Sequence, residues 1–167
     1  MKAAIFEKPG LENLKIQEDI EKPKITDHDV LIEVKATGVN PIDHFVVSGS
    51  REIKPQSPHI PGAEITGIVQ KIGNHVTSLK EGDRVVVYSR TFDGTCDMCL
   101  NGCEMLCRSG GLIGVITNGG FAEYIAVPER NAFKITDDVE WNVAASLAIS
   151  AITPYHALKE ASLKLNE

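Results

Sequence analysis

All four cysteines of the chain fall within twelve consecutive residues, and this clustering constrains the fold more than any other feature. They are Cys96, Cys99, Cys103 and Cys107, in the segment DGTCDMCLNGCEMLC that begins at Asp93. A structural zinc ion takes four tetrahedral ligands, and a Cys-x2-Cys pair lets one tight loop present two sulfurs to it. No βαβ pattern surrounds the pair, which argues against a redox motif. The clustering therefore predicts a metal site, in preference to ordinary buried or disulfide-bonded cysteines.

The residue spacing leaves two candidates for the fourth ligand. Cys96, Cys99 and Cys107 supply three sulfurs, and Cys103 would complete an all-cysteine set. Asp93 would instead complete the spacing D-x2-C-x2-C-x7-C, and a carboxylate oxygen is also an accepted zinc ligand. With four protein ligands no position stays open for water or substrate, so the predicted ion holds a loop and does not catalyse.

Composition excludes several classes of partner. The chain has 167 residues and a net charge of −6, and no basic run exceeds two residues. Nucleic acid and anionic membranes both need clustered Lys and Arg, so neither is an expected partner. The start MKAAIFEKPG lacks the apolar core of a signal peptide, and no apolar run could span a bilayer. We therefore expect a cytoplasmic location, where clustered cysteines more often bind metal than form disulfides.

Hydrophobic periodicity predicts a mainly β chain with short helices. Apolar or alternating segments separated by Gly and Pro turns are typical of a small barrel or sandwich. The expected strands are residues 2–6, 14–18, 30–37, 65–72, 84–88 and 121–127. Asn40 followed by Pro41 and Asp43 predicts a helix start, and residues 139–165 have helical spacing. Pro154 is expected to begin a second helix there or to kink the first.

Several segments in a fixed order resemble the medium-chain dehydrogenase/reductase superfamily, which contains zinc alcohol dehydrogenases and quinone oxidoreductases. The segments are KAAIF, VLIEVKATGVNPID, PHIPGAEITGIVQKIGNHVTSLKEGDRVVV, GGFAEYIAVPE and AASLAISAITPYHAL. The resemblance implies a GroES-like catalytic domain, a distorted β-barrel, over residues 1–135, with a zinc lobe at about 90–112. Residues 136–167 would be a helical segment leading to a Rossmann domain.

The Rossmann domain itself is expected to be absent from this chain, because no G-x-G-x-x-G motif follows any predicted strand. The resemblance implies that NAD(P)H binds through that domain, supplied in cis or in trans, so the chain alone is expected to be inactive. A small-molecule substrate and a homo-oligomer are also compatible with it. The family's structural zinc motif, C-x2-C-x2-C-x7-C, matches with Asp93 in place of the first cysteine, which favours Asp93 over the alternative ligand Cys103.

The resemblance argues against a second, catalytic zinc. In family alcohol dehydrogenases its three ligands would fall on Asn40, Ala63 and Ile149 of this chain. Ala63 and Ile149 have no donor atom and Asn40 has a neutral amide, so this set does not suit zinc. The segment GVNPID instead resembles zinc-independent quinone oxidoreductases and enoyl reductases, which transfer hydride from NADPH to a quinone or an activated alkene.

The expected catalytic residues are Asn40, Asp43 and Glu64, with His44 as a weaker candidate. Asn40 and Thr153 are expected near the nicotinamide. Asn40 is equally a helix N-cap, and the two carboxylates are equally structural groups. The leading hypothesis is thus an oxidoreductase domain acting on quinones, enones, carbonyls or alcohols. Two rivals remain: a zinc alcohol dehydrogenase with ligands shifted to His44, His59 or Glu64, and a stand-alone GroES-like binding or scaffold module.

Overall fold

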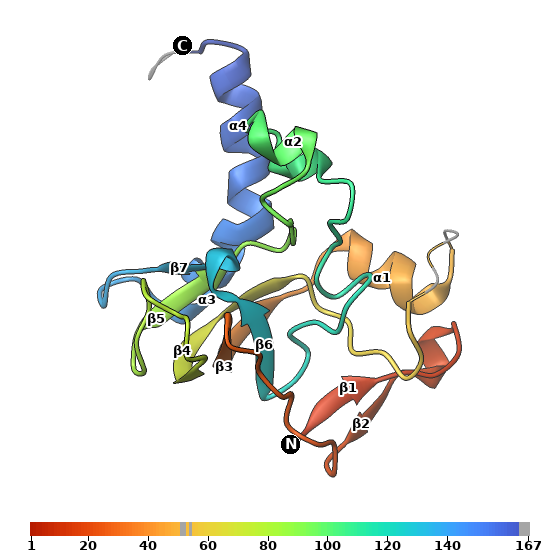
Figure 1. Ribbon diagram of the computed structural model, residues 1–167. Coiled ribbons are helices and arrows are strands. Elements are labelled where there is room, and N and C mark those ends of the chain that lie inside the picture. Colours follow the sequence, from red (N-terminus) through yellow and green to blue (C-terminus); the bar gives the residue numbers. More distant parts are fainter. Residues whose placement is uncertain (51–52, 54, 164–167) are drawn as a thin grey trace.

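A five-stranded antiparallel sheet forms the centre of the molecule (Figure 1). The computed structural model describes residues 1–50, 53 and 55–163. The sheet has the strand order β6-β3-β4-β5-β7, and a separate antiparallel pair, β1-β2, lies beside the N-terminus. The strands are β1 (Ala3–Ile5), β2 (Lys15–Gln17), β3 (Asp29–Gly38), β4 (Glu64–Ile72), β5 (Arg84–Val87), β6 (Tyr124–Pro128) and β7 (Ala132–Lys134).

The helical elements are short and lie outside this sheet. They are η1 (Leu11–Asn13), α1 (Pro41–Ser48), α2 (Asp97–Leu100), η2 (Glu104–Leu106), η3 (Glu129–Asn131), α3 (Trp141–Ser146), the π-helical segment η4 (Leu147–Ala151) and α4 (Ile152–Glu160). The mainly β fold with short helices and a C-terminal helical segment is the one predicted. No helix within the described ranges combines the length and the apolar character needed to cross a membrane.

The hydrophobic core lies on one face of the sheet, as the alternation in the sequence predicts. Val30 and Ile32 of β3 are fully buried, and so are Val85 and Val87 of β5. The first four residues of β4 are buried on both faces, because β4 is central in the sheet and α3 also packs against it. A continuous apolar run of this kind is what a doubly covered strand requires.

The β3–β4 register determines which residues meet at one edge of the molecule. Two irregularities interrupt the pairing, and it ends with Gly38 opposite Glu64. A Cβ atom on residue 38 would lie 2.0 Å from Glu64 Oε2, so only glycine allows this approach. The chain then turns at Asn40 into α1. Asn40 is the N-cap, Pro41 is the first helical residue, and Asp43 Oδ2 accepts from Asn40 N at 2.7 Å, as the sequence indicated.

The C-terminal segment contains a second helix close to the expected position and leaves it exposed. Helix α4 begins at Ile152, two residues before Pro154, and follows α3 through the π segment η4 without an intervening loop. A proline ring clashes with the carbonyl four residues earlier, which here belongs to Ser150, within the wider π turn. In Figure 1, α4 extends away from the sheet, and none of its residues is buried. The end of the expected helical segment, 164–165, lies outside the described residues.

Candidate functional site

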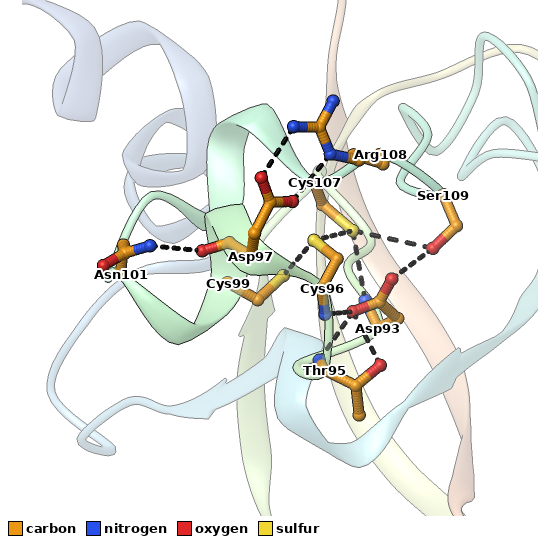
Figure 2. A network of polar contacts seen from close by, with 9 residues as sticks. All are labelled: Asp93, Thr95, Cys96, Asp97, Cys99, Asn101, Cys107, Arg108 and Ser109. Atoms are coloured by element: carbon orange, nitrogen blue, oxygen red, sulfur yellow. Dashed lines mark hydrogen bonds and ion pairs between the residues drawn. The ribbon is translucent and has the colours of Figure 1, made fainter.

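The loop that carries the cysteines brings four candidate metal ligands together (Figure 2). One ligand atom from each of Asp93, Cys96, Cys99 and Cys107 lies within 4.8 Å of all the others. Cys96 Sγ lies 3.5 Å from Cys99 Sγ and 3.9 Å from Cys107 Sγ. Sulfurs bound to one tetrahedral zinc at 2.3 Å would be about 3.8 Å apart, whereas disulfide sulfurs are about 2.05 Å apart. The donor set and its spacing therefore fit a zinc ion.

Local secondary structure explains how this short segment converges. Cys96 is the N-cap of α2, so one helical turn places Cys99 beside it, and the backbone N–H of Leu100 donates to Cys96 O at 2.9 Å. The chain then folds back through η2 to Cys107, whose side chain is buried. On the outside of the lobe, Arg108 makes a bidentate ion pair with Asp97, both bonds 2.6 Å long. Figure 2 shows this pair on the opposite side of the lobe segment from the carboxylate of Asp93.

The carboxylate of Asp93 is held in place by its own loop. Asp93 Oδ1 accepts from the backbone N–H groups of Thr95 at 2.6 Å and Cys96 at 2.8 Å, and the Ser109 hydroxyl donates to Oδ2. Together, the hydrogen bonds from Ser109, Thr95 and Cys96 hold the pKa of Asp93 well below its usual value. An ionised carboxylate is the form that ligates a metal.

The three sulfurs differ in their surroundings. Backbone hydrogen bonds from Arg108 and Cys99 lower the pKa of the Cys96 thiol, whereas burial raises the pKa of the Cys99 thiol to about 12. A bound cation would stabilise the thiolate form of both. Cys103 lies apart from the group, and its Sγ faces the carbonyl of Asn101 at 3.8 Å. The structure thus places Asp93, and not Cys103, with the other three cysteines.

A second polar group lies where β3, β4 and the π segment meet, and its centre is the carboxylate of Glu64. This side chain is 3% exposed. Its Oε2 accepts from Asn40 Nδ2 at 2.9 Å, and its Oε1 accepts from the backbone N–H groups of Ile149 at 3.3 Å and Ser150 at 2.7 Å. Asn40 and Ile149, two of the positions on which the family's catalytic zinc ligands would fall, are thus joined by the carboxylate of Glu64.

The neighbouring positions add hydrogen bonds but no metal ligand. Ala63 is fully buried, and its N–H and that of Gly62 both donate to Asp43 Oδ1 at 3.2 Å. Asp43 is 2% exposed, and burial, opposed by backbone hydrogen bonds, raises its pKa. Asn40, Asp43 and Glu64, the three expected catalytic residues, are therefore linked through hydrogen bonds into one cluster.

The other expected residues lie outside this cluster. Thr153 is on the exposed helix α4, and His44 is exposed on α1 with its ring edge toward Phe45. His59 is 1% exposed, and its Nε2 lies 3.0 Å from Gly114 O. Across the ranges that the structure describes, the lobe is the only place where three or more His, Cys, Asp or Glu ligand atoms converge. The shifted ligands of the zinc alcohol dehydrogenase rival are not brought together.

Sequence reasoning missed Ser150. Its N–H donates to Glu64 Oε1, and its hydroxyl lies 3.5 Å from Asn40 Oδ1, so it contacts two of the expected catalytic residues. In the sequence it stands in LAISAITPY, where helical spacing gives no sign of a polar function. The one available signal was its position directly after Ile149, where the resemblance placed a metal ligand.

The sheet and the cysteine lobe that projects from it define the class of the protein as a GroES-like domain. Residues 26–137 match the family described as the alcohol dehydrogenase GroES-like domain, and the chain belongs to this family. It is 39% identical over 171 residues to an alcohol dehydrogenase of Geobacillus stearothermophilus, covering 100% of this chain and 49% of the relative. It is 30% identical to human quinone oxidoreductase, covering 92% of this chain and 39% of the relative.

Solved structures agree with this assignment. The cobalt- and zinc-bound thermostable alcohol dehydrogenase from Pyrobaculum aerophilum is 44% identical and superimposes with a TM-score of 0.91, covering 100% of this chain and 50% of that one. The NADP-bound putative zinc-binding dehydrogenase from Sinorhizobium meliloti is 30% identical, with a TM-score of 0.78, covering 87% of this chain and 41% of that one. The chain spans about half the length of the curated relatives named above.

Proposed function

We propose that this chain is the catalytic-domain half of an NAD(P)H-dependent medium-chain oxidoreductase. Residues 1–135 form its GroES-like domain, and residues 136–167 lead to a dinucleotide-binding domain supplied in cis or in trans. A structural zinc is held by Asp93, Cys96, Cys99 and Cys107, and the catalytic region contains no zinc. The reaction is hydride transfer between the nicotinamide and a quinone, enone, carbonyl or alcohol. The lobe's free thiols suit the reducing cytoplasm.

The observation that carries the zinc-free assignment is the bonding of Glu64. Its two carboxylate oxygens already accept hydrogen bonds from Asn40 Nδ2 and from the N–H groups of Ile149 and Ser150. A buried carboxylate that accepts a hydrogen bond at each oxygen is satisfied without a cation. Ala63 contributes a methyl group and Ile149 an alkyl side chain, so two of the three positions of the family's catalytic zinc ligands offer no donor atom.

Each residue of the cluster has a distinct proposed role. We assign Asn40 the role of orienting the substrate oxygen or the nicotinamide through the second N–H of its Nδ2, because the first donates to Glu64 and its Oδ1 lies 3.5 Å from the Ser150 hydroxyl. Glu64 and Asp43 position it: Glu64 holds its amide, and Asp43 holds its backbone N–H. Thr153, exposed on α4, would contact the nicotinamide. The cofactor supplies the hydride, and the protein supplies orientation. We assign no catalytic role to His44, because its side chain forms no hydrogen bond with Asp43 or Glu64.

The decisive experiment joins this chain to the nucleotide-binding half of the Pyrobaculum relative and assays NADH and NADPH oxidation with quinones, enones, ketones and aldehydes. We expect turnover with at least one class, and a fall of about tenfold or more for Asn40→Ala. His44→Gln is the matched control on the same helix and is expected to retain full activity. Equal activity in Asn40→Ala and the parent would contradict the assigned role.

Elemental analysis separates the proposal from its rivals. One zinc per chain is expected, lost in Asp93→Ala and retained in Cys103→Ser. Two zincs per chain, with alcohol oxidation abolished by a chelator, would establish the zinc alcohol dehydrogenase with shifted ligands. A chimera that folds and binds NAD(P)H but turns over none of these substrates would favour the stand-alone binding or scaffold module.

A further inference from the structure

Two exposed histidines from distant parts of the chain meet on the surface, away from the residues discussed above. His75 Nδ1 lies 3.3 Å from His28 Nε2, and the ring centroids are 4.8 Å apart with an interplanar angle of 53°. His28 lies in the turn before β3 and His75 in the turn after β4. We propose that this histidine pair is a surface binding site for a late first-row divalent transition-metal ion, such as Ni²⁺, Cu²⁺ or Zn²⁺.

The backbone holds the two turns together without any ligand. His75 N donates to Asp27 O at 2.8 Å, Gly73 N donates to Asp29 O at 2.9 Å, and Asn74 Nδ2 donates to Asp27 Oδ1 at 2.8 Å. Gly73 allows the close approach, because a Cβ there would lie 2.3 Å from the carbonyl oxygen of Thr26. The imidazoles therefore face each other on a fixed framework, and little ordering is left for an ion to impose.

The distance between the two nitrogens matches metal coordination. Nitrogens bound at 2.0–2.1 Å to one tetrahedral ion are about 3.3–3.4 Å apart. In the free protein one of these nitrogens donates its N–H to the other. For an ion to bind both, the donor ring must take its other tautomer, with the proton on its second ring nitrogen, and the ion then lies off the line that joins the two ligating nitrogens. Imidazole suits Zn, Cu and Ni, whereas Mg and Ca prefer oxygen ligands. The chemical class of the ligand follows from the donor atoms.

Charge and coordination number set the expected strength of the site. The chain carries a net charge of −6, and Asp27 and Asp29 flank His28 in the sequence, so the local field favours a cation. No third His, Cys, Asp or Glu atom in the described part of the chain completes a group with the pair. Water would fill the remaining positions, so the site binds more weakly than the cysteine cluster and follows the order Cu²⁺ > Ni²⁺.

Calorimetric titration of the zinc-loaded chain with Ni²⁺ at pH 7.5 tests the proposal. One Ni²⁺ per chain is expected. Because outer-shell changes alone weaken metal affinity about 10- to 100-fold, loss of either histidine ligand should weaken Ni²⁺ binding at least tenfold. His28→Gln and His75→Gln are the test variants, and His44→Gln and His156→Gln are exposed controls expected to bind like the parent.

Two outcomes would overturn the proposal. In the first, His28→Gln and His75→Gln bind Ni²⁺ as tightly as the parent, and the contact is then only a hydrogen bond between rings. In the second, Ni²⁺ uptake is matched by release of zinc, measured by elemental analysis, and the nickel is then in the cysteine cluster. Broadening of the His28 and His75 imidazole NMR signals by paramagnetic Ni²⁺, with the other histidines unaffected, would independently support the site.

Discussion

At the scale of single residues, the cluster around Glu64 depends on one carboxylate that accepts hydrogen bonds from two other segments of the chain. Asn40 follows β3, Glu64 begins β4, and Ile149 and Ser150 lie in the π segment. These hydrogen bonds are part-buried, so removing the acceptor leaves donors that water reaches only in part, and this costs more than the net value of the bonds themselves. Glu64 is therefore a structural requirement as well as a proposed positioning residue.

The stability of a Glu64 variant tests this requirement. Glu64→Ala should lower the free energy of unfolding by about 2–4 kcal/mol, because it leaves the N–H groups of Ile149 and Ser150 without an acceptor. The matched control is Glu81→Ala, in an exposed turn, which should change it by less than about 0.5 kcal/mol. Urea denaturation at pH 7 measures both. Equal stabilities of the two variants would show that the Glu64 contacts contribute nothing.

A second carboxylate makes stability depend on pH. Burial alone would raise the pKa of Glu129, but hydrogen bonds from the N–H and hydroxyl of Ser78 and the N–H of Thr77 outweigh it, so the pKa is lowered. A lowered folded-state pKa stabilises the protein above the unfolded value of 4.5, and this contribution is lost as pH falls through the folded pKa. The parent should exceed Glu129→Gln in stability at pH 7 and lose that advantage below pH 4.5. An advantage that is unchanged at pH 3 would contradict this.

At the scale of secondary structure, two consecutive helices of the C-terminal segment have opposite environments. Ala144 and Ala145 of α3 are 0% and 3% exposed, and α3 packs against β3 and β4. Arg84 of β5 lies over the Trp141 ring, with its guanidinium carbon 3.9 Å from the centroid. Helix α4, by contrast, keeps Tyr155 69% exposed and Leu158 53% exposed. Only α3 contributes to the stability of this domain.

Paired substitutions separate the two helices. Ala144→Leu should destabilise the chain by about 1–3 kcal/mol, because the added side chain overpacks a site without free volume. Leu158→Ala should change stability by less than about 0.5 kcal/mol, because its side chain is already in solvent. Thermal unfolding of the 167-residue chain measures both. A large loss in Leu158→Ala would show that α4 packs against the domain.

At the scale of the whole molecule, the cysteine lobe and the sheet are stabilised by different sets of residues. The sheet core consists of strand residues such as Val30, Ile65 and Val85, whereas the lobe is organised around the Asp93–Ser109 segment with its thiol cluster. A short loop with few apolar contacts needs its metal to stay ordered. Loss of the ion should therefore loosen the lobe and leave the sheet folded.

Hydrogen exchange after chelation tests this separation. With zinc removed, the amides of 94–109 should lose protection, including Cys96 N and Leu100 N, which now donate to Asp93 and Cys96. The amides of β3 and β4 should keep theirs, since their ladder lies in the sheet core. The Cys103→Ser variant, whose side chain is outside the cluster, should behave like the parent. Simultaneous loss of protection in β3 and β4 would show that the metal supports the entire fold.

Local patterns determined much of this protein. Alternating apolar residues predicted β3 and β6, and β-branched apolar runs predicted β4 and β5, because both signals depend on immediate neighbours in the chain. The Asn-Pro-x-Asp start of α1 was predictable for the same reason, since a helix cap is formed within four residues. The cysteine spacing predicted a cluster, because its members are close in the chain. Strand β7 was not predicted, because a strand of three residues is too short to show a periodic pattern and is defined by its pairing with β5.

Tertiary structure decided where distant residues meet. Ser150 N reaches Glu64 across 86 positions, and His75 meets His28 across 47. The His28–His75 contact depends on the β3–β4 register with its two irregularities, and the Ser150–Glu64 contact depends on the packing of α3 and η4 against β4; no local pattern encodes either. The exclusion of Cys103 from the thiol group follows from how α2 and η2 fold back, not from spacing. Short-range periodicity in the sequence thus determines the individual strands and helix starts, whereas contacts between distant segments arise only when the strands pair and the helices pack.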